Sequence, residues 1–293
     1  MKKIIGLLFL LSLGISDGLN AQNIAKDTVP KKDTTKFDKL VQTVVKDTVP
    51  RKETKKDTIL EKKLEKHFYG VRQFTHETYL FIATPTRWHT ADWIRVGAVV
   101  AIAAVIMPFD RPINKAMQGN QHYYYSVPIV AGRVYGEWYS IGLVTAAFGG
   151  YGILAHDTAA KKIAIELFQA GVYSELFTEI FKIGIGRARP YENVGAFNFH
   201  PFNLNNNTES MPSGHSTSSF ALSTVMFRHA HSTFLKVLAF VPAGFTVFSR
   251  LYQDFHWSSD CFLGAVNGFS TGMWVVTLHE RKLHKINVPA DIK

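Results

Sequence analysis

The sequence predicts an all-α protein: a helical bundle of about six membrane-spanning helices, preceded by a signal peptide and a disordered tail. Long stretches without a charged residue recur from residue 91 onward, and the longest contain 18 residues. A helix of 18 residues extends over about 27 Å, which is close to the thickness of a bilayer core. Glycine and serine are scattered through these stretches, as is typical of helices that pack closely in lipid.

The chain begins with the pattern of a secretory signal peptide, which we place at residues 1–21. Lys2 and Lys3 precede an apolar run over residues 4–15, and small and polar residues follow up to Ala21. This run is too short to span a membrane comfortably, so we expect export and cleavage. The one cysteine, Cys261, excludes a disulfide-stabilised secreted fold and a zinc cluster of several cysteines.

Residues 22–66 form a Lys/Asp/Thr-rich segment that we expect to be a disordered linker. It contains 13 basic and 8 acidic residues, and its few apolar side chains cannot offset the entropy of ordering. Half of the formal net charge of +10 lies here, so the rest of the chain is only mildly basic and nucleic acid is not indicated as a partner. Asp-Thr followed by Val, Thr or Ile occurs four times and resembles the O-glycosylation acceptor pattern of exported bacterial proteins. The candidate glycan sites are Thr28, Thr34, Thr48 and Thr58.

Residues 67–90 are expected to connect the linker to a helical domain over residues 91–280, and residues 281–293 to form a basic C-terminal tail. The expected helices cover residues 93–107, 138–155, 163–181, 211–227, 237–249 and 261–278, with a weaker candidate at 123–135 that contains Arg133. Basic residues collect at alternate helix ends: Lys161 and Lys162, Arg228 and Lys236, and Arg281, Lys282 and Lys285. Positive charge favours the cytoplasmic side, so residues 182–214 and 249–260 are expected on the periplasmic face.

The residues on that face indicate a phosphate ligand. Residues 212–215 read Pro-Ser-Gly-His, and a proline suits the first turn of a helix. The residues after it would present free backbone N–H groups at a helix N-terminus, which is a ready anion site. Three cations add charge-assisted donors for a tetrahedral oxyanion: Lys182, Arg189 and Arg250.

Two histidines on this face divide the expected chemistry. His256 and Asp260 are one helical turn apart, so the carboxylate can accept the second imidazole N–H, fix the tautomer and raise the nucleophilicity of the ring. His215 then remains near the anion as a proton donor. We therefore expect one histidine to attack phosphorus and the other to protonate the leaving group.

Together these residues resemble the three-part signature of the type 2 phosphatidic acid phosphatase superfamily, in its membrane lipid phosphatase branch. This superfamily also contains nonspecific acid phosphatases and vanadium haloperoxidases. The signature reads Lys182, then Arg189-Pro190, then Pro212-Ser213-Gly214-His215, then Ser249-Arg250 with His256 and Asp260, and the resemblance covers residues 91–280.

The resemblance implies a role for each matching residue. His256 is the nucleophile that forms a phosphohistidine, Asp260 is its orienting partner, and His215 is the general acid. No metal or other cofactor is implied, because cationic side chains and helix N–H groups bind the phosphoryl oxygens. The implied phosphate-binding residues are Lys182, Arg189, Ser213, Gly214 and Arg250.

We therefore expect a metal-independent phosphohydrolase that acts on lipid phosphates or pyrophosphates in a bacterial inner membrane, with its site facing the periplasm. Undecaprenyl pyrophosphate, phosphatidylglycerol phosphate and a lipid A phosphate are candidate substrates, and the sequence does not choose among them. A soluble periplasmic nonspecific acid phosphatase, favoured by the weak helix candidate, and a vanadate-dependent haloperoxidase remain alternatives. Residues 191–211 join two of the motifs and are expected to set specificity.

Four further residues receive a simpler interpretation. Arg187 is expected to be a plain interfacial charge, and His229 and His231 to be solvated loop histidines. Glu179 lies three residues before Lys182 and is expected to steady that lysine.

The repeated Asp-Thr pattern leads to a prediction about the linker. In a host that O-glycosylates exported proteins, the four candidate threonines should carry glycan. The intact mass of the native protein should then exceed that of a variant with alanine at all four positions by more than the substitutions account for. Equal masses, after correction for the substitutions, would contradict the assignment.

Overall fold

The structure is a computed structural model that describes residues 70–285, and in this part of the chain every regular element is a helix. A single isolated antiparallel bridge joins Arg187 and Phe199. The α-helices are α4 (Val71–Ile82), α5 (Thr90–Ile106), α6 (Asp110–Gln118), α7 (Val127–Gly136), α8 (Trp138–Leu154), α9 (Thr158–Ile185), α10 (Gly214–His229), α11 (Thr233–Leu238), α12 (Val241–Tyr252) and α13 (Ser258–Lys285). The predicted all-α class is confirmed, whereas the signal peptide, the linker and its glycan sites lie outside the described residues.

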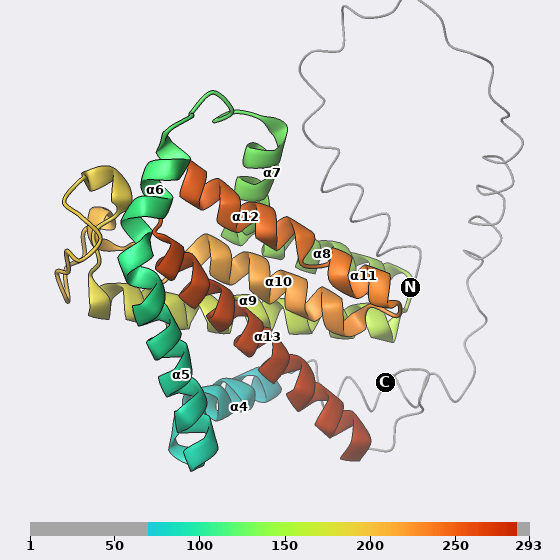
Figure 1. Cartoon of the computed structure of the whole chain (residues 1–293). Helices are drawn as coiled ribbons and strands as arrows, with labels where there is room; N and C mark the ends of the chain where they lie inside the picture. The colour runs from blue at the N-terminus through green and yellow to red at the C-terminus, as the bar shows by residue number, and fades with distance from the viewer. Residues whose placement is uncertain (1–69, 286–293) are drawn as a thin grey trace, which may run out of the picture. The chain divides into compact units, whose positions relative to one another are not determined.

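Helix α10 lies at the centre of the bundle and packs against α7, α8, α9, α12 and α13 (Figure 1). Its buried side chains include many small hydroxyl residues: Ser216, Thr217, Ser218, Ser219, Ser223 and Thr224. Several of these hydroxyls are satisfied within the helix, since Thr217 Oγ1 donates to the Ser213 carbonyl oxygen at 3.0 Å and Thr224 Oγ1 to that of Phe220 at 2.6 Å. Small side chains on this helix let its neighbours approach closely.

Helix α13 uses glycines for that approach. A Cβ atom added at Gly264 would lie 2.3 Å from the Ser213 carbonyl oxygen, and one at Gly268 would lie 2.1 Å from the Thr217 carbonyl oxygen. The two backbones therefore touch, and a larger residue at either position would push α13 away from α10. This contact holds the start of α13 against the start of α10.

Within residues 70–285, three helical stretches are long and apolar enough to cross a membrane: Thr90–Gln118, Thr233–Tyr252 and Ser258–Leu283, with α8 as a shorter apolar helix. Large apolar side chains on α5 are exposed, among them Trp93, Val100 and Val105. Such a surface fits a lipid environment. The expected number of about six spans is not confirmed, and α7, the weak candidate, has only 10 residues, which is too short to cross a bilayer.

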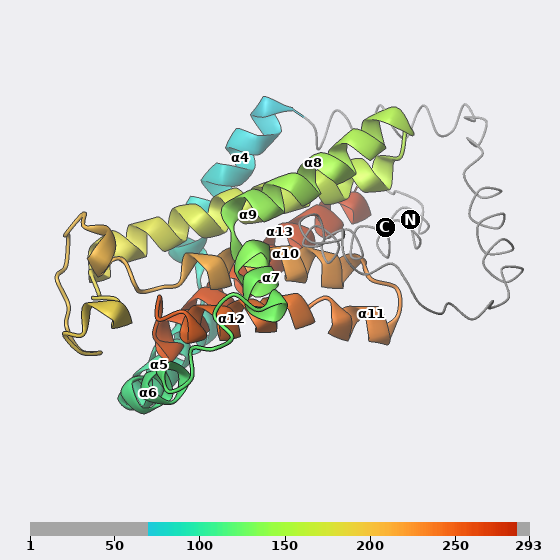
Figure 2. The same ribbon diagram turned by 90° about the horizontal axis from the view of Figure 1, so that it is seen from above.

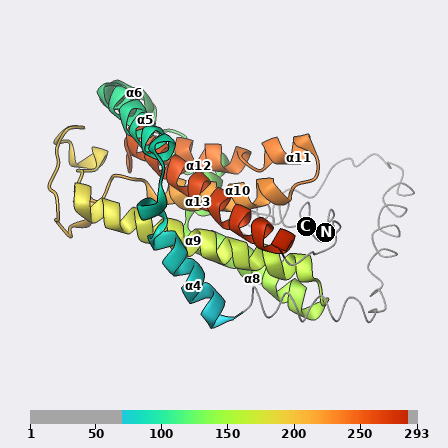
Figure 3. The same ribbon diagram turned by 90° about the horizontal axis from the view of Figure 1, so that it is seen from below.

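Helix α4 occupies part of the segment that we expected only to connect the linker to the bundle. The α4 ribbon lies close to α9 and α13 (Figure 3). Its Phe81 ring stacks on Tyr173 of α9 at 4.8 Å and meets the edge of Trp274 of α13 at 5.2 Å. The buried Glu77 accepts hydrogen bonds from Gln169 and Lys282. These contacts attach α4 to α9 and α13.

Two other expectations about this end of the bundle need correction. His229 is not a solvated loop residue, because it lies in the last turn of α10 and its ring contacts the buried Glu166 carboxylate. The last helix continues to Lys285, so the first residues of the expected C-terminal tail belong to α13.

A long connection between α9 and α10 gathers at the opposite end of the bundle (Figure 2). Gly186 ends α9 with φ +62°, and its N–H donates to the Lys182 carbonyl oxygen at 2.8 Å. A Cβ atom there would lie 1.8 Å from the His200 carbonyl oxygen, so both the backbone conformation and the space require glycine. The chain turns sharply here and folds back over the helix ends.

Candidate active site

The signature residues meet at one end of the bundle. Lys182 lies in the last turn of α9 and Arg250 in the last turn of α12, whereas His215 lies in the first turn of α10 and Asp260 in the first turn of α13. One close approach and two contacts join these helix ends. A Cβ atom on Gly214 would lie 3.4 Å from Lys182 Nζ, the Ser213 N–H donates to the Asp260 carbonyl oxygen at 3.0 Å, and Arg250 Nη1 lies 3.4 Å from His215 Nε2.

The start of α10 has the form of an anion site. Ser213 is the fully buried N-cap residue, and its Oγ accepts the Ser216 N–H at 3.4 Å. The first amide groups of a helix have no partner within the helix, which leaves those of Gly214 and His215 for a ligand. The missing side chain of Gly214 gives the Lys182 ammonium room beside these amides.

Lys182 is held in place by its own helix. Its Nζ donates to Glu179 Oε1 at 2.6 Å, and only 12% of the lysine side chain is exposed. The predicted role of Glu179 in steadying this lysine is therefore confirmed. The ammonium stands at the mouth of the anion site rather than extending into solvent.

The two signature arginines are fixed by different partners. Arg189 is half-buried, and its Nε donates to the Asn206 carbonyl oxygen at 2.8 Å. Arg250 is 2% exposed, and its Nη2 donates to Ser249 Oγ at 3.3 Å and to the Gln253 side chain. Within residues 70–285 the buried Arg250 Nε has no hydrogen-bond partner, so a donor remains available for a ligand oxygen.

His256 is buried and has a defined tautomer. Its Nδ1 lies 2.8 Å from the Ser210 carbonyl oxygen. A carbonyl can only accept, so Nδ1 carries the proton and Nε2 keeps its lone pair. Burial, together with the positive charges of Arg189, Lys182 and Arg250, holds the pKa of His256 well below its usual value. The ring is therefore neutral at neutral pH and Nε2 can act as a nucleophile.

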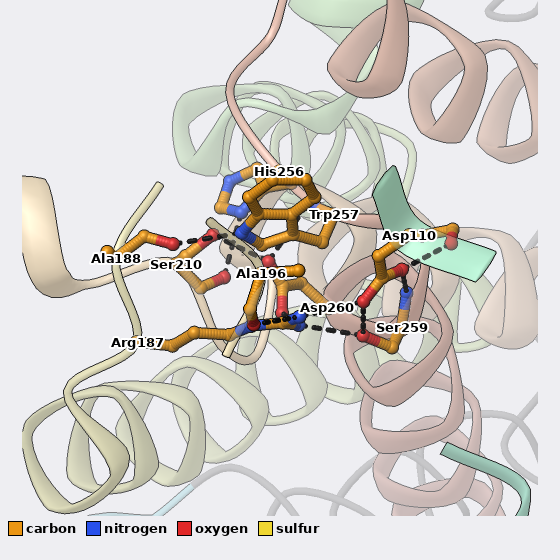
Figure 4. A network of polar contacts seen from close by, with 10 residues as sticks. Asp110, Arg187, Ala188, Ala196, Ser210, His256, Trp257, Ser259 and Asp260 are labelled. Carbon is orange, nitrogen blue, oxygen red and sulfur yellow. Dashed lines mark hydrogen bonds and ion pairs between the residues drawn. The ribbon is translucent and has the colours of Figure 1, made fainter. Parts of the chain in front are cut away.

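The expected contact between Asp260 and His256 is absent from the hydrogen bonds of the described residues. Asp260 Oδ2 instead accepts from Ser210 Oγ at 2.5 Å and from the Trp257 N–H at 2.9 Å (Figure 4). The helical spacing misled us because α13 begins at Ser258, after His256, so these two residues are not one turn apart on one helix. Asp260 therefore acts on the imidazole indirectly: it binds the Ser210 hydroxyl, and the Ser210 carbonyl oxygen binds His256 Nδ1.

Arg187 is not an interfacial charge, which corrects our expectation. It is completely buried, and its Nη1 donates to Asp260 Oδ1 at 2.5 Å while its Nη2 donates to Asp110 Oδ2 at 2.7 Å (Figure 4). The Ala196 carbonyl oxygen accepts from both Nε and Nη2, at 2.9 and 2.7 Å. Asp110 also accepts from the Ser259 N–H at 2.9 Å. The guanidinium thus joins α6, the long connection and α13 behind His256.

Sequence reasoning missed Asp110, Arg187 and Ser210. Asp110 is a lone acid directly after an apolar run, and Arg187 is a second arginine inside the first motif; both were visible but had no evident partner. Ser210 acts at His256 through its backbone carbonyl, which no side-chain pattern indicates.

The long connection contains a polar cavity of about 250 Å³. It is lined by Ala188, Glu192, Val194, Asn198, His200, Asn203, Asn205, Asn207 and Thr208. The cavity adjoins Arg189, a predicted phosphate-binding residue, because Arg189 follows Ala188 and its N–H donates to the Asn207 carbonyl oxygen at 2.9 Å. Polar side chains therefore surround the space next to the anion site.

Comparison with known proteins shows what this chain is similar to. The sequence profile described as PAP2 superfamily matches residues 164–283. The lipid A 1-phosphatase of Rhizobium etli is 30% identical over 200 residues, which are 63% of this chain and 82% of that protein. The lipid A 1-phosphatase of Rhizobium johnstonii is 29% identical over 205 residues, 65% of this chain and 78% of that protein. A crystal structure of Aquifex aeolicus LpxE matches 58% of this chain and 95% of its own, with 17% identity and a TM-score of 0.43.

Substitution of the two neighbouring arginines should separate stability from phosphate binding. Arg187→Met leaves two buried carboxylates without their cation, which should cost roughly 3–5 kcal/mol of folding free energy and lower Tm by roughly 10 °C in a protein of this size. Arg189→Met, the matched control, should keep Tm near that of the wild type but weaken inhibition by inorganic phosphate at least about tenfold. Thermal unfolding and inhibition assays on the purified full chain test this. Equal Tm values for the two variants would contradict the assigned division.

Proposed function

The chain belongs to the type 2 phosphatidic acid phosphatase (PAP2) superfamily and is a lipid phosphatase; on that premise we propose that it is a metal-independent phosphohydrolase with a histidine nucleophile. The observation that supports this most is the state of His256. Its Nδ1 is bound to the Ser210 carbonyl oxygen, and its ring centroid lies 6.4 Å from that of His215. A phosphoryl group between the two rings would meet a nucleophile on one side and a proton donor on the other.

The proposed reaction has two displacements at phosphorus. In the first, His256 Nε2 attacks, the bond between phosphorus and the leaving oxygen breaks, and His215 gives that oxygen a proton. In the second, water attacks the phosphohistidine, His215 takes a proton from the water, and the bond between phosphorus and nitrogen breaks to release inorganic phosphate. Lys182, Arg189 and Arg250 stabilise the negative charge on the phosphoryl oxygens in both transition states.

We propose a phosphorylated or pyrophosphorylated lipid of the cell envelope as substrate. The two relatives from Rhizobium are named lipid A 1-phosphatase, and they favour a lipid in which the phosphate is attached to a sugar. The polar cavity of the long connection supports a polar head group beside the anion site. Undecaprenyl pyrophosphate and phosphatidylglycerol phosphate remain in the test panel, because the phosphate site itself would accept each of them.

We further propose that the site faces the periplasm from the inner membrane. The basic residues that motivate this orientation lie at the end of the bundle away from the site. Lys161 is near the start of α9, Arg228 is near the end of α10, and Lys282 is in the last turns of α13. Basic residues favour the cytoplasmic side, so the opposite helix ends would face the periplasm.

The function is tested by phosphate release from the purified full chain across envelope lipids, with soluble phosphate esters as controls. Lipids should be the better substrates, and His256→Ala should abolish release from all of them. His215→Ala should lower the rate of hydrolysis of a lipid alkyl phosphate about a hundred- to ten-thousand-fold. The rate of phosphoenzyme formation from an activated aryl phosphate should fall much less. A preference for soluble esters would instead indicate an acid phosphatase, and halide oxidation with added vanadate would indicate a haloperoxidase.

The orientation is tested by labelling single cysteines in a Cys261→Ala background. Asn205→Cys and His231→Cys place the thiol at opposite ends of α10. On intact spheroplasts an impermeant maleimide should label the first variant and not the second. The reverse pattern would invert the orientation, and equal labelling of both would favour a soluble periplasmic protein.

A further inference from the structure

A carboxylate outside the signature lies against the proposed general acid. Glu137 follows the last residue of α7 and precedes α8, and its Oε1 lies 3.2 Å from His215 Nε2. About a quarter of each side chain is exposed. Resting on the proposed function, we propose that Glu137 is a positioning residue that keeps a proton on His215 Nε2, the nitrogen that serves the leaving group.

The junction that presents Glu137 is tightly fixed. A Cβ atom added at Gly136 would lie 2.4 Å from Thr246 Cγ2 and 3.0 Å from the His215 carbonyl oxygen, and one at Gly132 would lie 2.3 Å from the Phe245 carbonyl oxygen. Thr246 Oγ1 also donates to the Gly132 carbonyl oxygen at 2.7 Å. These two glycines, four residues apart, let α7 lie directly on α12 and on the start of α10. The short helix that cannot span a membrane thus delivers a carboxylate to the site.

The charges around His215 explain why a carboxylate is needed there. Arg250 of α12 has its Nη1 3.4 Å from the same Nε2 atom, and Lys182 of α9 adds a second positive charge. Burial, together with these two cations, lowers the pKa of His215, because each disfavours the protonated imidazole. Glu137 opposes them from the start of α8.

Glu137 is itself ionised at neutral pH. The hydrogen bond with His215 lowers the pKa of this carboxyl against the opposing effect of partial burial, and the charges of Arg250 and Arg133 lower it further. A carboxylate only accepts and a guanidinium only donates, so the two neighbours of Nε2 favour opposite states of this nitrogen. Glu137 Oε1, at 3.2 Å, is nearer than Arg250 Nη1, at 3.4 Å, and this closer contact favours a proton on Nε2. Because Arg250 approaches the same atom, Nε2 faces the phosphate-binding side of the ring.

The proton can therefore return to the same place in each cycle. His215 Nε2 gives its proton to the leaving oxygen as the first bond to phosphorus breaks, and the ring becomes neutral. When water attacks the phosphohistidine, Nε2 takes up the water proton, and the Glu137 carboxylate stabilises the protonated ring once more. Glu137 makes no bond to substrate in either step.

The first test measures the His215 titration in the full chain with ¹⁵N-labelled histidine, assigned by the signal that His215→Asn removes. Glu137→Gln should lower the His215 pKa by about one unit, which is tenfold in proton affinity, and Glu137→Asp should restore part of it. The control is Glu280→Gln, which removes a carboxylate paired with Arg228 near the other end of α10 and should leave this titration unchanged.

The second test measures the rates. Glu137→Gln should lower turnover of a lipid alkyl phosphate about ten- to a hundredfold and move the alkaline limb of its pH profile to lower pH, because the protonated acid is lost sooner. Phosphoenzyme formation from an activated aryl phosphate should fall less than about threefold. In a His215→Asn background, Glu137→Gln should not lower the turnover rate any further.

An unchanged His215 titration in Glu137→Gln would overturn the inference, and so would equal losses on both substrates. The titration and the rate measurements also distinguish failure of the inference about Glu137 from failure of the proposed function. If the wild type hydrolyses no lipid phosphate, the function is wrong, and the titration still decides whether Glu137 holds the proton on His215.

Discussion

The buried guanidinium of Arg187 is the interaction on which the geometry of the site depends. It pairs with Asp110 at the start of α6 and with Asp260 at the start of α13, and it also binds the Ala196 carbonyl oxygen of the long connection. Three segments distant in sequence are therefore fixed by one planar group with five donors. A buried charge that lost its partners would be costly, so the three segments keep their mutual positions.

Neutral groups connect these ion pairs to His256, the proposed nucleophile. Asp260 holds Ser210 by its hydroxyl, and the Ser210 carbonyl holds His256 by Nδ1. The carboxylates thus lie behind the imidazole, and the cations that would bind phosphate lie in front of it. Because His256 is kept neutral by burial and by those cations, its lone pair and the positive charges can coexist in one site.

The sequence predicted which residues meet at the site better than it predicted the contacts that hold them there. Lys182, Gly214 and Arg250 were expected to meet because each lies at the end of an apolar run, and the four helix ends do meet. The prediction that Asp260 binds His256 directly was wrong, because spacing along the chain does not show where α13 begins. The sequence did not indicate Ser210, because this residue binds His256 through its backbone carbonyl. It did not indicate Glu137 either, because the helix that precedes this residue, α7, has only 10 residues and was a weak candidate. The number of membrane spans stays a prediction, because apolar composition alone does not distinguish a spanning helix from a short one inside the bundle.

The most direct measurement is the identity of the phosphorylated atom. The protein would be mixed rapidly with substrate, quenched in base and digested, and the phosphopeptide would be analysed for the position of the phosphoryl group on the ring. Because Nδ1 is bound to the Ser210 carbonyl oxygen, the phosphoryl group should be found on Nε2 of His256, stable in base and labile in acid. Phosphate on Nδ1, phosphate on any other residue, or turnover without a phosphoenzyme would contradict the assigned nucleophile.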